Sequence, residues 1–137
     1  MKNTRIKICG VTRIEEALAA QALGADAVGF VFVERSKRKI DVANAQAISE
    51  RLGPFVQRVG LFLDAPSTLV SETLEAIPGL MPQFHGREDA DYCDSFKSDY
   101  LKAIGLGDGP PQAASLDAFK RCTVSYTHLT LPTICSV

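Results

Sequence analysis

The sequence lacks several features that mark other classes of protein. It has no tryptophan, no long apolar run and no pair of cysteines at C-x-x-C spacing. Its longest apolar stretch, residues 27–33, has seven residues, whereas a helix that spans a bilayer needs about 20. The wide spacing of the cysteines argues against a disulfide framework and against a metal site. These cysteines are Cys9, Cys93, Cys122 and Cys135.

An excess of charge of one sign is also missing. The chain carries 15 Lys and Arg against 16 Asp and Glu, for a formal net charge of -1. That balance gives no electrostatic reason to expect nucleic acid or an anionic membrane as a partner. Because no apolar core follows the first charged residues, no signal peptide is predicted. We therefore expect a soluble, cytoplasmic chain with no membrane partner, no nucleic-acid partner and no metal.

Short β-rich runs alternate with helical stretches along the chain. The runs begin 20 to 30 residues apart, which leaves room for one helix and two loops each time. The second and third runs are mostly apolar, as is typical of strands buried on both faces of a parallel sheet. The pattern predicts an α/β fold with right-handed crossovers. The five runs are residues 5–9, 27–33, 57–62, 80–84 and 100–104.

The helices between these runs have recognisable start and stop signals. Thr12 and Glu15 form a T-x-x-E capping box, and Gly24 stands where a left-handed residue would end that helix. A second helix is predicted from Asp41 to the Gly-Pro at 53–54. A third begins near residues 66–67 and ends before the Pro-Gly at 78–79. A weaker fourth covers residues 88–96.

Two architectures fit this order of elements: an open, doubly wound sheet and a (β/α)8 barrel. The barrel needs eight units and usually at least about 200 residues. The 137 residues hold five βα units and part of a sixth at the observed spacing. If the chain is a barrel, it is therefore an incomplete one.

Residues 123–137 differ in composition from the rest. They contain four threonines, no charged residue and no glycine, whereas the 23% charge of the chain would place about three or four charges there. One interpretation is a β-strand followed by a flexible terminus. The other is sequence foreign to the gene, of the kind produced when adapter DNA is translated, and this is the one that we adopt. We predict a partial (β/α)8 barrel over residues 1–122 and a non-native tail over residues 123–137.

Several polar residues stand where α/β enzymes place their catalytic groups, at the C-terminal ends of parallel strands. Cys9 ends the first run, and it is either a base or nucleophile or a small buried hydrophobe. Arg38 belongs to a charged loop, residues 34–39, which is either a solvated surface or a carboxylate or phosphate site. His85 follows the fourth run, where a lone histidine is more often structural. Asp64 stands on the same face or caps a helix, and Lys102 lines either a site or only the barrel.

Six segments together resemble phosphoribosylanthranilate isomerase, an enzyme family of tryptophan biosynthesis. They occur in the family's order and cover roughly residues 5 to 105. K-I-C-G-x-T at the first strand combined with Q-x-H-G at the fourth is a specific combination. The segments are K-I-C-G-V-T (7–12), G-A-D-A-V-G-F-V-F (24–32), S-K-R (36–38), R-V-G-L-F (58–62), Q-F-H-G (83–86) and K-A-I-G (102–105).

This resemblance implies a TIM barrel and an isomerase reaction. The reaction is the Amadori rearrangement, of aldose-ketose type, of N-(5-phosphoribosyl)anthranilate to 1-(2-carboxyphenylamino)-1-deoxyribulose 5-phosphate. By motif match Cys9 is the general base, Arg38 holds the anthranilate carboxylate and His85 lines the same site. The resemblance implies no cofactor, a phosphorylated small molecule as substrate, and a monomer or homodimer at full length.

The sequence also departs from the family. The family's acid is an aspartate at the end of the sixth strand, and no aspartate follows Asp117 here. The glycine-rich phosphate loops after the seventh and eighth strands have no counterpart. We therefore expect the N-terminal five-eighths of the enzyme, inactive on its own. The alternatives are a non-catalytic α/β ligand-binding module and a half-barrel that assembles with a partner.

Overall fold

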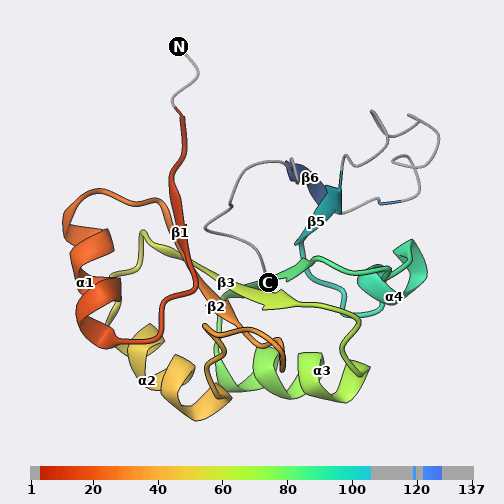
Figure 1. Cartoon of the computed structure of the whole chain (residues 1–137), viewed down its shortest axis with the longest axis horizontal. Coiled ribbons are helices and arrows are strands. Elements are labelled where there is room, and N and C mark those ends of the chain that lie inside the picture. Colours follow the sequence, from red (N-terminus) through yellow and green to blue (C-terminus); the bar gives the residue numbers. More distant parts are fainter. Residues whose placement is uncertain (1–3, 106–118, 120–121, 128–137) are drawn as a thin grey trace.

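The computed structural model of the chain describes residues 4–105, 119 and 122–127. Within these residues a six-stranded sheet has the strand order β1-β2-β3-β4-β5-β6, and all neighbouring strands are parallel. Figure 1 shows α1, α2 and α3 following one another along one side of this sheet. The strands are β1 (Lys7–Cys9), β2 (Ala27–Val31), β3 (Gln57–Phe62), β4 (Leu80–Phe84), β5 (Tyr100–Gly105) and β6 (Cys122–Thr127). The helices are α1 (Ile14–Ala22), α2 (Val42–Arg51), α3 (Ser67–Ala76) and α4 (Ala90–Asp94).

All five strands predicted from the sequence are present. β3 and β4 have the predicted bounds, whereas β1 begins two residues later than predicted. β2 ends at Val31 rather than at residue 33. At Val31 the following loop folds back, because the Ile40 N–H donates to the Val31 carbonyl at 3.0 Å. The predicted α/β class with a parallel sheet is confirmed.

The helix boundaries follow the predicted signals, with two differences. Asp41 caps α2 by accepting a hydrogen bond from the Asn44 N–H at 2.8 Å, and Gly24 has the left-handed φ of 86° expected after α1. The predicted capping box is wrong by one residue: Glu16, not Glu15, accepts from the Arg13 N–H at 3.2 Å, because α1 begins at Ile14. The fourth helix is shorter than predicted, since α4 covers only Ala90–Asp94.

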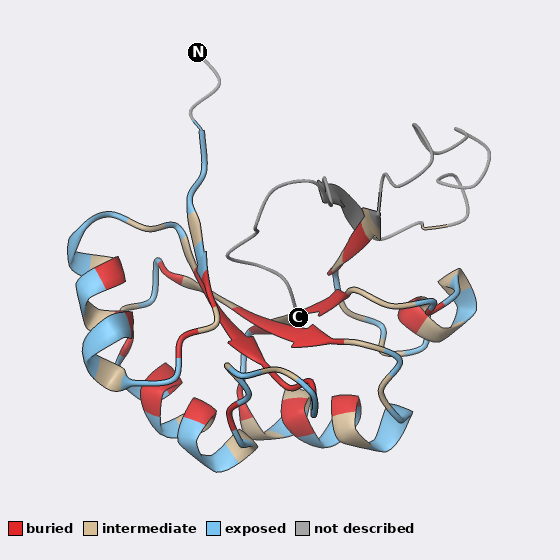
Figure 2. Cartoon of the chain, in the orientation of Figure 1, coloured by how far each residue is buried: buried red, intermediate tan, exposed pale blue. Residues whose placement is uncertain are grey.

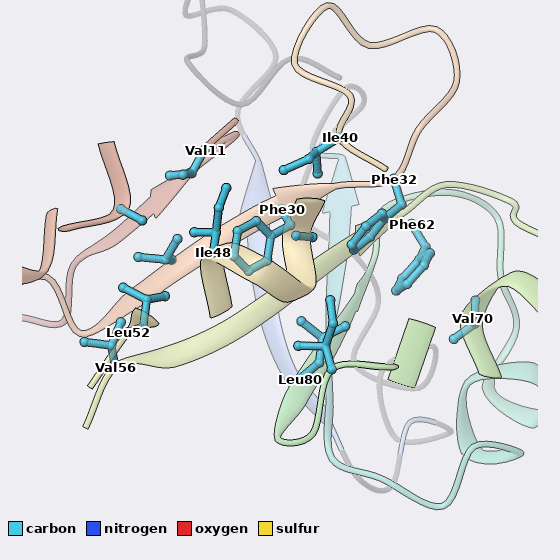
Figure 3. Packing of buried hydrophobic residues seen from close by; sticks show 14 of the residues in the cluster. Val11, Phe30, Phe32, Ile40, Ile48, Leu52, Val56, Phe62, Val70 and Leu80 are labelled. Atoms are coloured by element: carbon cyan, nitrogen blue, oxygen red, sulfur yellow. The ribbon is translucent and has the colours of Figure 1, made fainter. Parts of the chain in front are cut away.

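The main core lies between the sheet and the helices. Figure 2 shows the buried residues on the strands and on the sides of the helices that face them. Phe32 and Phe62 stack with their ring centroids 5.4 Å apart. Figure 3 shows Ile48 beside Phe30, and Leu52 beside Val56 at the other end of the same cluster. Each fully buried side chain of this size contributes roughly 1.5–3 kcal/mol. This packing fixes the strands, and therefore fixes the loops at their ends.

Arg58 of β3 joins the end of α2 to the sheet. Its guanidinium donates to the carbonyls of Ser49 and Leu52 at 2.8 and 2.7 Å, and to those of Gly53 and Val56 at 2.9 and 2.6 Å. The last carbonyls of a helix have no partner within the helix, and a cation there also favours the helix dipole. Partial burial lowers the pKa of Arg58 from its ordinary value, although a guanidinium stays charged at neutral pH.

The sheet is open in the described residues, because β1 and β6 stand at the two ends of the strand order. At the β1 end Ile6 and Ile8 are 52% and 42% exposed, whereas no large apolar residue of β2, β3 or β4 is exposed. Continuous parallel βα units with an open end are what the sequence predicts for an incomplete barrel. None of the helices in the described ranges has the length and apolar character that a bilayer crossing requires.

β6 falls partly in the predicted tail. It pairs with β5 from Tyr100–Cys122 to Gly105–Thr127, so residues 123–127 form a strand, as one of the two interpretations of this segment holds. Residues 128–137 of the tail lie outside the described residues. The origin of residues 123–137 stays a prediction.

Candidate active site

Cys9 ends β1 on the face of the sheet that is turned away from the helices. It is 9% exposed and belongs to a small cluster with Val31, Val33 and Leu61. Its partner in the β2 register is Gly29, and a Cβ on Gly29 would stand 3.0 Å from the Cys9 Sγ. The glycine therefore leaves room for the thiol between the two strands.

Arg38 reaches from the loop after β2 to the end of β1. Its Nη1 donates to the Cys9 carbonyl at 3.0 Å, and its backbone N–H donates to the Ser36 Oγ at 3.2 Å. Gly10 has a left-handed φ of 82°, and a Cβ there would stand 2.6 Å from the Arg38 Nη1. A side chain at position 10 would thus be strained and would also displace the guanidinium. The structure brings two of the predicted site residues, Cys9 and Arg38, into contact.

The other charges of the same loop face the solvent. Lys39 forms an ion pair with Glu34 at 2.6 Å, with 40% and 87% of their side chains exposed. Exposed pairs of this kind contribute about 0–1 kcal/mol. Arg35 and Lys37 are exposed as well. Most of this charged loop is therefore a solvated surface, and within residues 34–39 Arg38 is the residue that contacts Cys9.

His85 follows β4 at the same edge of the sheet. Its backbone N–H donates to the Phe62 carbonyl at 2.9 Å, and its Nδ1 is buried without a hydrogen-bond partner among the described residues. Burial is the largest influence on the imidazole and lowers the pKa of His85, the charges of Lys7 and Lys102 lower it further, and Glu88 opposes them. The imidazole is therefore neutral at neutral pH.

Lys7 is a polar residue of this face that the sequence did not single out. Its Nζ donates to the Oε1 of Gln83 on β4, which is not a neighbour of β1 in the sheet. Residues i and i+2 of a strand share a face, so Lys7 lies on the same side as Cys9. Alternation along β1 could have placed it there, but only once the inward side of Cys9 was known.

Glu88 is the second residue that the sequence missed. Its Oε1 accepts from the Asp64 N–H at 2.8 Å, and its Oε2 accepts from the Gly86 N–H at 2.8 Å. The Nζ of Lys102 on β5 donates to the same Oε2 at 2.9 Å and to the Gly86 carbonyl at 2.8 Å. We call these four residues the Glu88 junction. It connects the loops after β3 and β4 to β5.

Lys102 does not point to the inner face of the sheet. The interpretation that it lines the inside of the barrel is therefore wrong. Its register partner on β4 is Phe84, and register partners in a parallel pair point to the same side. The Phe84 ring packs on Tyr92 and Phe96, at centroid distances of 5.7 and 5.8 Å. Lys102 therefore lies on the helix-covered side, where Glu88 neutralises it.

Asp64 contributes to the loop contacts and does not cap α3. The residue that precedes α3 is Pro66, and the Asp64 Oδ1 instead accepts from the Arg87 N–H at 2.7 Å. A Cβ on Gly86 would stand 2.5 Å from this oxygen. Gly86 is thus needed for the close approach of the two loops, whereas the helix-capping interpretation is wrong.

Cys9 and Cys93 differ in environment. Cys93 of α4 is fully buried, and burial raises its pKa to about 12, so it stays protonated and inert at neutral pH. Cys9 instead stands at a strand end beside a guanidinium. No group of three or more His, Cys, Asp or Glu in the described part of the chain could hold a metal ion. A thiol, a guanidinium and a neutral imidazole at one sheet edge can together hold an anion and transfer a proton.

Comparisons with known proteins agree on one family. The family model for N-(5'phosphoribosyl)anthranilate (PRA) isomerase matches residues 6–123. The N-(5'-phosphoribosyl)anthranilate isomerase of Pseudomonas fluorescens SBW25 is 48% identical over 119 residues, which are 87% of this chain and 57% of that protein. The enzyme of Pseudomonas putida W619 is 49% identical over 109 residues, which are 80% and 53%. The chain thus spans about half the length of the curated relatives it matches.

Solved structures with the same name are also similar. The phosphoribosyl anthranilate isomerase from Thermus thermophilus superposes with a TM-score of 0.72 at 45% identity, over 80% of this chain and 55% of that one. The enzyme from Thermotoga maritima gives 0.77 at 30% identity, over 94% and 64%. A complex of such an enzyme with reduced 1-(o-carboxyphenylamino)-1-deoxyribulose 5-phosphate gives 0.77 at 31% identity, over 91% and 66%.

Proposed function

Because the chain belongs to the N-(5'-phosphoribosyl)anthranilate isomerase family, we propose a function for a full-length protein that contains it. Such a protein catalyses the Amadori rearrangement of N-(5-phosphoribosyl)anthranilate in tryptophan biosynthesis. The observation that carries the proposal is the contact of Arg38 with Cys9 at 3.0 Å, inside residues 6–123, which the family model matches. A structural relative that holds a reduced product-like ligand supports the same class of substrate.

The proposed chemistry is an exchange of protons along the sugar. An acid protonates the ring oxygen and opens the furanose, which leaves a double bond between C1 and the protonated nitrogen. A base then removes the C2 proton, and the electrons of that C–H bond neutralise the nitrogen to give an enolamine. Transfer of a proton to C1 and loss of the C2 hydroxyl proton give the ketone. The substrate nitrogen accepts the electrons, so the proposal includes no cofactor and no metal.

Cys9 is the proposed base of this reaction. It lies at the strand end where such groups act in α/β barrels, with its thiol beside Gly29. A base has to be deprotonated, and neighbouring cations favour the thiolate. The Arg38 guanidinium donates a hydrogen bond to the Cys9 carbonyl. Lys7 stands two residues before Cys9 and lies on the same face of β1. Both charges support the proposed role.

Arg38 and His85 are the proposed binding residues. A guanidinium has five N–H donors, so its bond to the Cys9 carbonyl leaves donors for a bidentate pair with the anthranilate carboxylate. The neutral imidazole of His85 lines the same edge and can donate or accept a hydrogen bond there. The proposed ligand is a phosphorylated small molecule. We propose that the full-length protein is cytoplasmic and is a monomer or a homodimer.

The acid and the phosphate site belong to the part of the family's barrel that has no counterpart here. No aspartate follows Asp117, and the family match stops at residue 123. Both facts support the proposal that residues 1–122 are a partial barrel and that residues 123–137 are not native. They also support the proposal that the 137-residue chain is inactive alone.

The test compares this chain with a completed protein. In the completed protein, residues 1–122 are joined to the C-terminal part of the Pseudomonas fluorescens SBW25 relative. We expect the completed protein to remove the fluorescence of N-(5-phosphoribosyl)anthranilate with saturable kinetics. The 137-residue chain should not exceed the uncatalysed rate. A folded completed protein without turnover would contradict the proposed function, and turnover by the 137-residue chain would contradict the partial-barrel proposal.

A further inference from the structure

Glu88 is a buried carboxylate that the proposed reaction does not use. Its side chain is 2% exposed, and that of its partner Lys102 is 6% exposed. Burying two charges is costly unless hydrogen bonds satisfy them. Here the two carboxylate oxygens accept three hydrogen bonds, from the Asp64 N–H, the Gly86 N–H and the Lys102 Nζ. These hydrogen bonds satisfy the buried charge of Glu88. They also fix the positions of the groups that donate them.

Backbone hydrogen bonds hold the chain at His85 and at the next residue, Gly86, which belongs to the Glu88 junction. On one side of the histidine, its own N–H is held by the Phe62 carbonyl of β3. On the other side, both the N–H and the carbonyl of Gly86 are held, by Glu88 and by Lys102. The backbone around His85 therefore has little freedom to turn, and its half-buried ring is confined to the sheet edge.

We propose that Glu88, paired with Lys102, is a positioning residue that holds the His85 imidazole at the edge of the substrate site. The proposal depends on the proposed function only for the identity of that site. Glu88 acts through the backbone of Gly86, which it bonds, and needs no contact with substrate. Lys102 neutralises the carboxylate and adds the second bond to Gly86.

Glu88 can affect the pKa of His85 in two ways, through its negative charge and by holding the ring in a buried position. These two effects have opposite signs, so an experiment can separate them. Lys7 from β1, Lys102 from β5 and Glu88 from the loop after β4 are the charges that act on the ring. The negative charge of Glu88 raises the pKa of His85, whereas burial lowers it and is the largest influence. If Glu88 were only a nearby charge, its removal would lower the pKa further. If Glu88 holds the ring in its buried position, its removal exposes the ring and raises the pKa.

The experiment is an NMR titration of His85 in the 137-residue chain, with the signal assigned by comparison with His85→Asn. In the unchanged chain we expect His85 to titrate below its ordinary value of 6.5. In Glu88→Gln the pKa should rise toward that value. A fall or no change in Glu88→Gln would overturn the proposal. An ordinary pKa in the unchanged chain would overturn it as well, because the ring would then not be held.

Two further variants control for charge and for loss of the fold. Glu88→Asp keeps the charge but shortens the side chain, so it should raise the pKa of His85 without any change of charge. Asp89→Asn removes the neighbouring exposed carboxylate, whose Oδ1 caps α4 through the Tyr92 N–H, and asparagine caps equally well. This control should leave His85 unchanged, and an equal rise in it would overturn the proposal. Circular dichroism checks the fold, and unfolding of both Glu88 variants would show that Glu88 holds the sheet rather than the ring.

A kinetic cycle in the completed protein links the positioning to binding. Glu88→Gln should raise KM about tenfold in the His85 background and have no further effect in His85→Asn, since residues that act as a unit are not additive. Equal effects in both backgrounds would overturn the proposal. Absence of turnover in the completed protein would contradict the proposed function, whereas the NMR titration does not depend on turnover.

Discussion

The two ends of the parallel sheet differ in what they hold. At the N-terminal ends of the strands lies a cavity of about 810 Å³, lined among others by Arg5, Asp26 and Phe55. At the C-terminal ends, where the proposed chemistry lies, the cavities measure about 290 and 250 Å³. The larger of these hollows is therefore at the end away from Cys9, Arg38 and His85.

What distinguishes the C-terminal end is the convergence of polar groups. Arg38 binds the end of β1, and the Glu88 junction fixes the loops around His85. At the N-terminal end, the side chain of Arg58 is occupied by the carbonyls at the end of α2. Arg58 therefore serves the fold, whereas Arg38 at the C-terminal end is the proposed ligand-binding residue. The four predictions below test this difference, in order of decreasing effect.

Cys9→Ser should have the largest effect. In the completed protein we expect kcat to fall by roughly 10²–10⁴-fold, the usual loss for a general base. KM should change only a few-fold, because the lost interaction belongs to the transition state. The measurement is steady-state fluorescence kinetics. Cys93→Ala is the matched control, because that thiol belongs to α4 and is fully buried there, so the change should leave kcat unchanged. Near-normal turnover in Cys9→Ser would refute the role of base.

Arg58→Met should have the opposite character, a large loss of stability and no loss of catalysis. The change removes the four hydrogen bonds of the guanidinium to the carbonyls of Ser49, Leu52, Gly53 and Val56. The Ser49 and Gly53 carbonyls keep a backbone N–H donor, so the loss falls mainly on the other two. Unsatisfied buried groups cost about 1–3 kcal/mol each, partly offset by water, so we expect about 3 kcal/mol less free energy of unfolding. Urea unfolding of the completed protein measures it. Arg51→Met, at an exposed position of α2, should stay within about 0.5 kcal/mol. A loss of kcat at unchanged stability would break the comparison.

Much of the fold could be predicted because its signals are local. Alternating apolar runs and turn residues gave all five predicted strands, and Asp41 and Gly24 marked helix ends correctly. The α1 cap was wrong because Glu15 and Glu16 are adjacent and either can reach back, depending on where the first turn begins. That starting point is set by how α1 packs on the sheet. The strand at β6 was one of two interpretations, since an uncharged Thr-rich segment suits a strand whatever its origin.

The candidate site could be predicted in part. Strand-end positions indicated that Cys9, Arg38 and His85 share an edge, and the contact of Arg38 with Cys9 agrees. Glu88 could not be found, because a charged residue after a turn usually faces water. Its burial depends on the close approach of Gly86 to Asp64. The side of Lys102 depends on the register of β5, and a shift of one residue reverses every side chain of a strand.

Arg38→Met should have a smaller effect, confined to binding. A charge-assisted pair with a carboxylate contributes about 2 kcal/mol, so we expect KM of the completed protein to rise about 30-fold. The loss should shrink for an analogue without the carboxylate, N-(5-phosphoribosyl)aniline. Arg35→Met, an exposed neighbour in the same loop, is the control and should change KM less than twofold. Equal losses for both substrates would contradict the proposed pairing.

Phe55→Ser should have the smallest effect, although it changes the lining of the cavity of about 810 Å³. The Phe55 ring is 97% exposed, so its removal uncovers almost no apolar surface and breaks no packing. Surface changes of this kind usually stay within about 0.5 kcal/mol. We expect urea unfolding, kcat and KM of the completed protein to match those of the unchanged protein. A KM raised several-fold would mean that substrate contacts the N-terminal end of the sheet. The size of a cavity, and not the convergence of polar groups, would then have identified the site.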